Sequence, residues 1–295
     1  IVRLTHSFTD NSATIRIEGL ATSVRMLHLT DTHLQFYDRR DGENYDACVD
    51  YCRRFAKMME ERNTNYLPEE AFRKTMAQAA TENLDLLALT GDIIHFPSPA
   101  SVEFVVEQIA DLDVPAMYTC GNHDVHYTNE PVNHEVRLTR LPALQPLHDG
   151  DPDCAVQEIG GIRFVSIDNS IPQISRKQVD FMHMQLQMGQ PIVLLIHWPL
   201  SLPTLRDSTI EALGSPPMMG DPDWPSESRI SWQVGEDAPE TLEFVHSVTT
   251  APNLVAVFCG HVHIEHVDSI NTRAVQYVGR PGLEGGRRLV EFRPM

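Results

Sequence analysis

Five short polar motifs, each closing a strand-like segment, constrain this chain of 295 residues more than any other feature. The carboxyl ends of parallel strands meet along one rim of a sheet, which is where α/β proteins place their ligands. We therefore expect the motif side chains to converge. In chain order the motifs are Asp31-Thr32-His33, Gly91-Asp92, Gly121-Asn122-His123-Asp124, His197-Trp198-Pro199 and Gly260-His261-Val262-His263.

The residue types in these motifs are those that bind transition metals. Carboxylate, imidazole and amide ligands suit manganese, iron, zinc, cobalt and nickel. The glycines before Asp92, Asn122 and His261 allow tight turns and a close approach of the backbone. Each motif alone is weak, because Asp-x-His and Gly-Asp occur often by chance. Their order, their strand-end placement and their chemistry agree, so the series predicts a metal site.

The hydrophobic patterns predict an α/β fold in which helices flank two mixed β-sheets. Strand and helix patterns alternate near the start, which favours parallel pairing, whereas Gly160-Gly161 between two strand patterns indicates a hairpin. Strands are expected at 13–18, 24–30, 84–90, 114–119, 154–159, 162–167, 191–196 and 254–258, and helices at 46–62, 68–81, 101–112, 175–188 and 238–247. The tail, 267–292, is expected to form short antiparallel strands.

We expect a single domain over 1–295 with three additions. These are an N-terminal strand extension at 1–22, a helical insertion at about 45–81 and a lid-like loop at about 202–237. The insertion is expected to pack beside the site or to carry an oligomer contact. The lid segment is rich in Pro, Ser, Gly and Asp, and so long a stretch without clear structure is usually a functional lid or a mobile loop.

The net charge and the lack of long apolar runs limit the kinds of partner that this chain is expected to bind. The formal net charge is −18, and an acidic surface repels phosphate backbones, so nucleic acid is an unfavourable partner. Bound cations can invert the sign inside a site, so a small phosphorylated substrate stays compatible with this charge. No apolar run approaches the roughly 20 residues of a membrane-spanning helix. Formation of a homo-oligomer stays open.

The cysteines and the first residue bear on the compartment. The odd number of five cysteines and their irregular spacing do not predict a disulfide framework, and a reduced cytoplasmic location is favoured. The sequence begins at Ile1 rather than Met, so a removed signal peptide and secretion also stay open.

The motif series resembles the calcineurin-like metallophosphoesterase superfamily, whose pattern is D-x-H, G-D, G-N-H-[D/E], H and G-H-x-H. Every position of that pattern has a match between residues 31 and 263. The resemblance implies a four-layer α-β-β-α sandwich. The Gly-Asn-His-Asp motif is similar to the cyclic-nucleotide and glycerophosphodiester phosphodiesterase branch more than to the protein serine/threonine phosphatases.

By motif position, the resemblance also implies a role for each residue. A hydroxide shared between two metals, with manganese, iron or zinc expected, would attack phosphorus. His123 would protonate the leaving group, and Asp124 would orient His123. The implied ligands are Asp31, His33 and His263 for the first metal, Asn122, His197 and His261 for the second, and Asp92 as the bridge between them.

Five further residues are candidate substrate contacts. His95 stands where purple acid phosphatases carry a ligating tyrosine, and we favour a hydrogen bond to a ligand or a substrate contact over ligation. Arg39 and Arg40 either reach over the phosphate or form a surface pair. His126 follows the third motif and Asn169 closes the strand at 162–167, so each either reaches the substrate or is an ordinary structural residue.

The function expected from these features is dinuclear metal-dependent hydrolysis of phosphoesters, with a phosphodiesterase favoured. The first alternative is a phosphomonoesterase with the same site, and the lid at 202–237 is expected to decide between the two. The second alternative is a non-catalytic metal-binding scaffold of the same fold. Such scaffolds tend to lose ligands or the acid histidine, and this sequence keeps all of them. A nuclease is disfavoured by the acidic charge.

Overall fold

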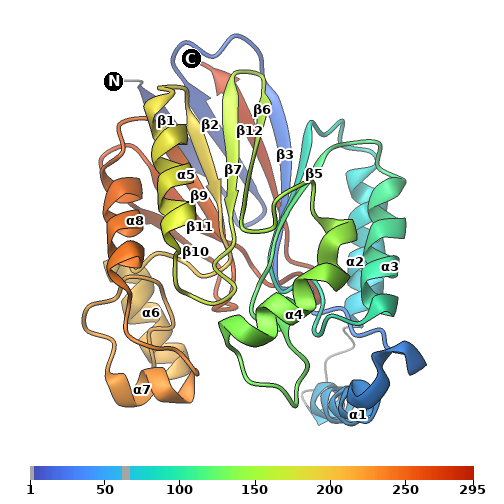
Figure 1. Ribbon diagram of the computed structural model, residues 1–295. Coiled ribbons are helices and arrows are strands. Elements are labelled where there is room, and N and C mark those ends of the chain that lie inside the picture. The colour runs from blue at the N-terminus through green and yellow to red at the C-terminus, as the bar shows by residue number, and fades with distance from the viewer. Residues whose placement is uncertain (1–2, 62–66) are drawn as a thin grey trace.

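Two six-stranded sheets pack face to face in the computed structural model, which describes residues 3–61 and 67–295 (Figure 1). The first sheet has the order β1 (Leu4–Phe8), β2 (Ser12–Ile17), β12 (Arg288–Pro294), β3 (Val24–Leu29), β4 (Leu86–Thr90) and β5 (Ala116–Thr119). The second has the order β10 (His266–Ser269), β11 (Val275–Val278), β9 (Leu254–Cys259), β8 (Ile192–Leu195), β7 (Ile162–Ile167) and β6 (Cys154–Ile159).

Both sheets are mixed, as predicted. In the first, β3, β4 and β5 are parallel, whereas β12 is antiparallel to β3 and β1 is antiparallel to β2. In the second, β7, β8, β9 and β11 are parallel, and β6 and β10 are antiparallel edge strands. The predicted N-terminal extension therefore adds two strands to an edge of the first sheet.

The strand side chains alternate between two apolar layers. In β4, Leu86 and Ala88 lie in the cluster between the two sheets, whereas Leu87 and Leu89 lie in the cluster beneath the helices. This period of two with burial on both faces explains why the central strands are continuous apolar runs.

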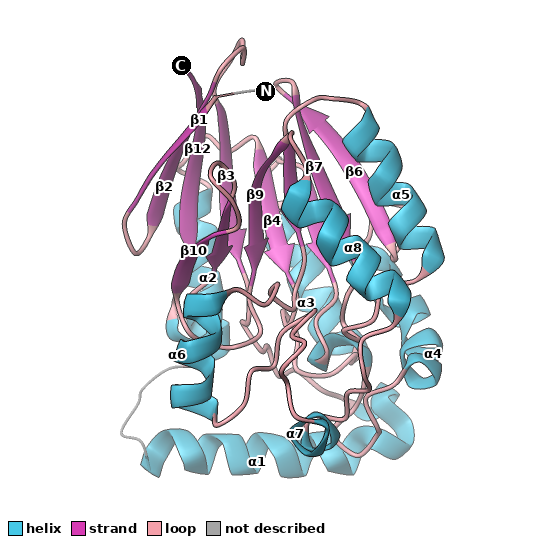
Figure 2. Cartoon of the chain, turned by 90° about the vertical axis from the view of Figure 1, so that its left-hand side faces the viewer, coloured by secondary structure: helices cyan, strands magenta, loops and turns pink. Residues whose placement is uncertain are grey.

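Helices cover the outer face of each sheet and complete four layers (Figure 1). On the first sheet lie α2 (Pro68–Ala79), α3 (Pro99–Ala110) and α4 (His134–Leu144). On the second lie α5 (Arg176–Gln187), α6 (Pro203–Leu213) and α8 (Pro239–Thr250). Two more helices, α1 (Tyr45–Glu61) and α7 (Ser226–Ser231), lie by the loops at one end of the sheets (Figure 2). The predicted four-layer sandwich is confirmed.

The predicted insertion at about 45–81 is smaller than expected. Phe72, Met76 and Ala79 of α2 are buried against the first sheet, so α2 belongs to the helical layer and α1 alone is an addition to it. Between the helices expected at 46–62 and 68–81, residues 62–66 lie outside the described part of the chain.

The segment 202–237 is also more ordered than predicted, because it contains α6 and α7. The buried Arg229 guanidinium donates to the Asp221 carbonyl at 2.8 Å and to the Asp237 carboxylate at 2.9 Å. The prolines and glycines that suggested a loop mark the helix ends instead. Pro203 opens α6, and Gly214 follows it in the left-handed conformation.

The remaining differences lie in α4 and in the tail. The helix α4 was not predicted, because Pro142 inside it disrupts its helical pattern, although Asn133 caps its first turn. The tail was expected to be antiparallel throughout, but β11 is parallel to β9 and β12 is parallel to β2. Among the described residues, no helix is long and apolar enough to cross a membrane.

Candidate metal centre and active site

Hydrogen bonds tie the strand-end loops to one another, both within each sheet and between the two sheets. The amide of Asp31 donates to the Gly91 carbonyl at 3.0 Å, and the amide of Gly260 donates to the His197 carbonyl at 3.0 Å. The amide of His261 donates to the Asp31 carboxylate at 3.1 Å, which links the last motif to the first. The structure thus brings the motifs together at one rim.

The motif residues adopt strained backbone conformations. A positive φ is uncommon for a residue other than glycine, and such strain concentrates at functional sites. The structure describes eight non-glycine residues with positive φ, and five of them are predicted ligands. These five are Asp31 (52°), His33 (47°), Asp92 (50°), His261 (73°) and His263 (54°).

Two motif glycines make room for the carboxylates. A Cβ atom at Gly121 would lie 2.2 Å from Asp92 Oδ1, and one at Gly260 would lie 2.2 Å from Asp31 Oδ2. No side chain fits in these places, so glycine is required beside each buried aspartate.

The first donor cluster consists of Asp31, His33 and His263, whose ligand atoms all lie within 4.8 Å of one another. The Nε2 atoms of the two histidines are 3.0 Å apart, and His263 Nε2 lies 3.3 Å from Asp31 Oδ1. Three atoms with lone pairs therefore point toward one small volume.

The second donor cluster consists of Asp92, His197 and His261, again within 4.8 Å. Asp92 Oδ2 lies 3.2 Å from His197 Nε2 and 3.8 Å from His33 Nε2, which belongs to the first cluster. Asp92 therefore stands between the two clusters, in the position expected of a bridging ligand.

Unpaired buried atoms show that these donors fit metal ions. Asn122 Oδ1 and both ring nitrogens of His261 are buried without a hydrogen-bond partner among the described residues. Leaving a buried polar atom unpaired costs about 1–3 kcal/mol, so proteins normally pair such atoms. Carboxylate, imidazole and amide atoms together are the donor set of first-row transition metals, and the residues present fit two of them.

Hydrogen bonds outside the clusters fix the orientation of two histidines. His197 Nδ1 lies 2.8 Å from the Thr90 carbonyl, which can only accept, so Nδ1 carries the proton and Nε2 faces Asp92. His33 Nδ1 lies 3.0 Å from His95 Nδ1 and so faces away from His263. His95 thus contacts a predicted ligand through that ligand's outer nitrogen, and its own ring nitrogen lies with those of His33 and His123 in a third group that could hold a metal, so its role stays a prediction.

The charges of the clusters also suit cations. Burial alone would raise the pKa of the Asp92 carboxyl, but the facing His197 and His123 hold it well below its usual range. Burial and the nearby His197 lower the pKa of His261 well below its usual value. Burial opposes protonation of His197 as well, yet the Asp92 carboxylate raises its pKa to about 9. A metal ion between Asp92 and His197 would therefore displace a proton.

His123 lies beside the clusters, with its ring facing two other histidines. Its ring centroid is 4.3 Å from that of His95 and 4.9 Å from that of His33, while its backbone amide donates to Asp92 Oδ1 at 2.8 Å. The Nδ1 atom is buried without a hydrogen-bond partner among the described residues. Burial lowers the pKa of His123 to about 4, against the opposing effect of Asp92.

Asp124 does not hold the His123 ring, contrary to expectation. Its carboxylate accepts hydrogen bonds from the backbone amides of Gly121 (2.7 Å), Asp92 (2.8 Å) and Ile94 (2.9 Å). The tight turn of the third motif aims this side chain back at the second motif. Asp124 therefore positions the two loops, and burial together with the Asp92 charge raises its pKa to about 8.

Arg39 and Arg40 do not reach the site, so the surface interpretation is correct. The Arg39 guanidinium lies over the Tyr45 ring at 4.1 Å from its centroid. Arg40 forms ion pairs with Asp38 at 2.7 Å and Glu103 at 2.5 Å, and its side chain is half exposed. Arg40 has these acidic partners at the surface and so remains outside the cavity.

Asn169 supports the site instead of facing a substrate. Its Oδ1 accepts from the amides of His197 (2.8 Å) and Trp198 (3.1 Å), and its Nδ2 donates to the Trp198 carbonyl at 2.9 Å. The side chain is completely buried. It fixes the backbone that carries a predicted ligand.

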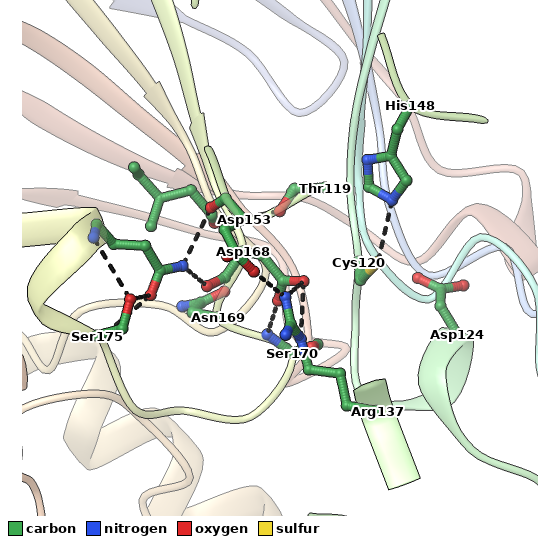
Figure 3. Close-up of polar contacts among 12 residues, drawn as sticks. Thr119, Cys120, Asp124, Arg137, His148, Asp153, Asp168, Asn169, Ser170 and Ser175 are labelled. Atoms are coloured by element: carbon green, nitrogen blue, oxygen red, sulfur yellow. Dashed lines mark hydrogen bonds and ion pairs between the residues drawn. The ribbon is translucent and has the colours of Figure 1, made fainter. Parts of the chain in front are cut away.

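An ion-pair network that the sequence did not indicate lies beside Asn169 (Figure 3). Arg137 of α4 donates to the Asp168 carboxylate at 2.7 Å and to the Asp153 carboxylate at 2.6 Å. It thereby anchors the helix that follows the third motif to the end of β7, next to Asn169 (Figure 3). No local pattern marks such an arginine, because its partners are distant in sequence.

The segment 202–237 packs against the second cluster. Trp198 stacks on the His261 ring with centroids 3.5 Å apart, and Trp232 meets the same ring edge-on at 5.7 Å. Trp198, Trp224 and Val234 form a buried cluster that Trp232 extends. This segment therefore braces a predicted ligand.

A cavity of about 430 Å³ opens beside the first cluster. One side is formed by motif loops and includes His126, one of the candidate substrate contacts. The other side is formed by α1, which crosses beneath the strand ends (Figure 2). The insertion at about 45–81 was expected to pack beside the site or to carry an oligomer contact, and α1 lies beside the site. The lining consists of His33, Tyr51, Arg54, Phe55, Met58, Met59, His95, His123, His126, Thr128, His263 and Leu283.

Comparisons with solved structures place this arrangement among known folds. A dimetal phosphatase from Danio rerio is similar with a TM-score of 0.54 and 12% identity, over 88% of each chain. A purple acid phosphatase from yellow lupin is similar with a TM-score of 0.52 and 13% identity, over 93% of this chain and 47% of that one. At these identities the likeness concerns the fold.

Comparisons of sequence identify the family. A probable cyclic nucleotide phosphodiesterase of Synechococcus is 31% identical over 225 residues, which are 71% of this chain and 72% of the relative. The sequence model of the calcineurin-like phosphoesterases matches residues 24–265, which contain all five motifs. The chain, a phosphoester hydrolase by family, belongs to the calcineurin-like phosphoesterases.

Proposed function

We propose that the chain is a dinuclear metal-dependent phosphodiesterase that acts on a small phosphorylated substrate, with His123 as the acid. One observation carries this proposal. Two donor clusters meet at Asp92, and the cavity beside them is lined by the predicted acid, His123.

The proposed metal sites use the motif residues and Asn122. Asp31, His33 and His263 would hold one ion, Asn122, His197 and His261 the other, and Asp92 would contact both. Two such ions, for which manganese, iron or zinc suit the donors, supply Lewis acidity for phosphoryl oxygens and a water-derived nucleophile at neutral pH.

His123 supplies the proton in this proposal. Burial keeps its ring neutral at pH 7, but an anionic ester in the cavity favours the protonated ring and raises its pKa. As the bond between phosphorus and the leaving oxygen breaks, the imidazolium gives its proton to that oxygen. His95 and His33, which lie against the ring, limit its orientation.

Two observations favour a diester over a monoester. The similar protein from Synechococcus is described as a probable cyclic nucleotide phosphodiesterase. The α1 wall of the cavity offers the apolar Phe55 and Met58 beside one arginine, Arg54, whereas a dianionic monoester favours several cationic contacts.

A screen of two substrates against several metals tests this function. Bis(p-nitrophenyl) phosphate and p-nitrophenyl phosphate are compared with manganese, iron, zinc, cobalt and magnesium, and bound metal is counted by elemental analysis. We expect two ions per chain and a preference for the diester of about tenfold or more in kcat/KM. A preference for the monoester would instead establish a phosphatase. Full metal loading without hydrolysis of either ester would establish a scaffold.

The variant His123→Ala tests the acid role. With a phosphodiester that has an alcohol leaving group, its rate should fall by about 10²–10⁴ while two metals stay bound. His183→Ala is the matched control, because His183 bonds Ser247 on the outer helices at 2.9 Å. An unchanged rate for His123→Ala would remove His123 from the mechanism.

A further inference from the structure

We propose that one face of α1 determines substrate choice: Phe55 and Met58 bind an aromatic ester group, and Arg54 binds an anionic phosphoryl oxygen. The proposal rests on the function proposed above and names its substrate class, phosphodiesters with a flat aromatic ester group. It assigns a binding role to a segment that contains no motif residue.

The geometry of α1 carries the first step. Tyr51, Arg54, Phe55 and Met58 have the spacing of one helical face, and all four line the cavity. The Tyr51 ring stacks on that of His95 with centroids 3.8 Å apart and planes inclined by 17°. His95 in turn lies 4.3 Å from His123. The face therefore starts beside the proposed acid, and a rise of 1.5 Å per residue carries it about 10 Å onward to Met58.

The charge of Arg54 supplies the second step. Among the described residues that line the cavity, none is a carboxylate, although the chain carries a net charge of −18. In the described part of the chain, Arg54 makes no ion pair, and its Nε donates only to the Asp50 carbonyl at 3.4 Å. By contrast, Arg53 beside it pairs with Asp50 at 3.1 Å. Arg54 therefore keeps guanidinium donors for an anion.

The apolar part of the face supplies the third step. Phe55 and Met58 are half-buried at the cavity, and ligand pockets are lined mainly by such side chains with a few polar groups. A phenylalanine ring stacks with aromatic groups, and a methionine side chain adapts to their shape. The cavity of about 430 Å³ lies within the usual range for small ligands.

A matched pair of substrates tests the apolar face of α1 while the leaving group stays the same. p-Nitrophenyl phenyl phosphate and p-nitrophenyl methyl phosphate share a leaving group and differ only in the second ester group. We expect the wild-type protein to favour the phenyl ester by about tenfold in kcat/KM. Phe55→Ser and Met58→Ser should each lower this ratio several-fold, because the phenyl ester loses more than the methyl ester. Since both side chains are only half-buried, these substitutions leave the core intact.

The variant Arg54→Gln tests the anion contact. It should raise KM about tenfold for both esters with little change in kcat, because a contact made equally in the ground and transition states affects binding. Arg53→Gln, one residue away with a side chain 74% exposed, is the matched control and should behave as wild type. Equal effects at positions 53 and 54 would overturn the role of Arg54.

Binding measurements separate this inference from the proposed function. Calorimetry on the metal-loaded protein should show phenyl phosphate binding more tightly than methyl phosphate, and the serine variants should lose the difference. If the wild-type protein cleaves neither diester, the proposed function fails, but this binding result still tests the wall. If neither the rate ratio nor the binding difference changes in the serine variants, the binding role proposed for Phe55 and Met58 is wrong.

Discussion

The strand-end loops and α1 border the same cavity but differ in how the protein holds them. The loops carry donors of which five, Asp31, His33, Asp92, His197 and His261, are buried, with strained backbones fixed by hydrogen bonds between motifs. In α1, by contrast, Cys48 is the one buried residue described, and most other side chains are half-buried or exposed. The difference indicates a division of roles. Changes in the loops should affect all substrates alike, whereas changes at Phe55 and Met58 of α1 should alter the ratio between substrates.

The segment 202–237 belongs with the loops in this comparison. Among the described residues that line the cavity, none comes from this segment. Its Trp232 instead contacts the ring of His261, which Trp198 covers from another side. The sequence suggested that a lid at 202–237 decides between ester types. We therefore assign that role to α1 instead.

The largest effect is expected for Asp92→Asn in the loops. The neutral amide removes the charge that stands between the two clusters, 3.2 Å from His197 and 3.8 Å from His33. We expect the loss of at least one metal per chain and a fall in kcat/KM of about a thousandfold or more for phenyl and methyl esters alike. Elemental analysis and kinetics on both esters measure this. Retention of two metals would refute the bridging role.

A smaller effect is expected for Asn169→Ala, which leaves the amides of His197 and Trp198 without their acceptor. Residues that orient ligands typically contribute about 10–100-fold in metal affinity or activity, and we expect a loss in that range. Metal titration of the variant gives the affinity. Asn253→Ala is the control, since Asn253 is similarly buried and bonds the Leu186 and Gln190 carbonyls instead. If both variants lose metal equally, the effect is one of general stability.

The sequence predicted the loops well because their chemistry is local. A strand pattern followed by Asp or His gives both the position and the donor, so Asp31, Asp92 and His261 were found together with their convergence. The predicted hairpin at 154–167 also matches β6 and β7, since Gly160 and Gly161 mark its turn.

What the sequence did not predict depends on contacts between distant segments. Asp124 was expected to orient the ring of His123, and Asn169 was a candidate substrate contact, but their hydrogen bonds go to backbone atoms, including those of other loops. The helical pattern of α1 was recognised, but a pattern shows which residues share a face and not what that face meets. Arg54 could be assigned to the cavity only once α1 was placed across the strand ends.

A modest effect is expected for Trp232→Ala, the variant that most directly distinguishes the role of the strand-end loops from the role of α1. Removing an edge-on ring contact costs about 0.5–1.5 kcal/mol, so kcat/KM should fall roughly two- to tenfold. Because Trp232 contacts a proposed ligand and does not line the cavity, both esters should lose the same factor. The ratio of kcat/KM values for phenyl and methyl esters measures this. A changed ratio would show that this segment contacts the substrate as α1 does.

The smallest effect concerns the support beneath the loops and depends on pH. His28 of β3 is buried and its Nε2 lies 2.7 Å from Thr90 Oγ1 of β4, which joins the strands that carry the first two motifs. Burial, with the nearby Arg288, lowers the pKa of His28 to about 3. The unfolded chain, with an ordinary histidine pKa of about 6.5, therefore binds more protons between these values.

The contribution of His28 to the free energy of unfolding is thus fully present above pH 7. It is lost as the pH falls from about 6.5 toward 3, by at most about 1.4 kcal/mol per pH unit. The variant His28→Gln can still bond Thr90 but cannot gain a proton, so its unfolding free energy should depend less on pH. We expect wild type to be the more stable at pH 8 and the difference to shrink or reverse by pH 5. Thermal unfolding of both metal-free proteins across this range measures the difference. Parallel curves would mean that His28 does not titrate on unfolding. The helix α1, in which Cys48 is the one buried residue described, contains no histidine that could give this pH dependence instead.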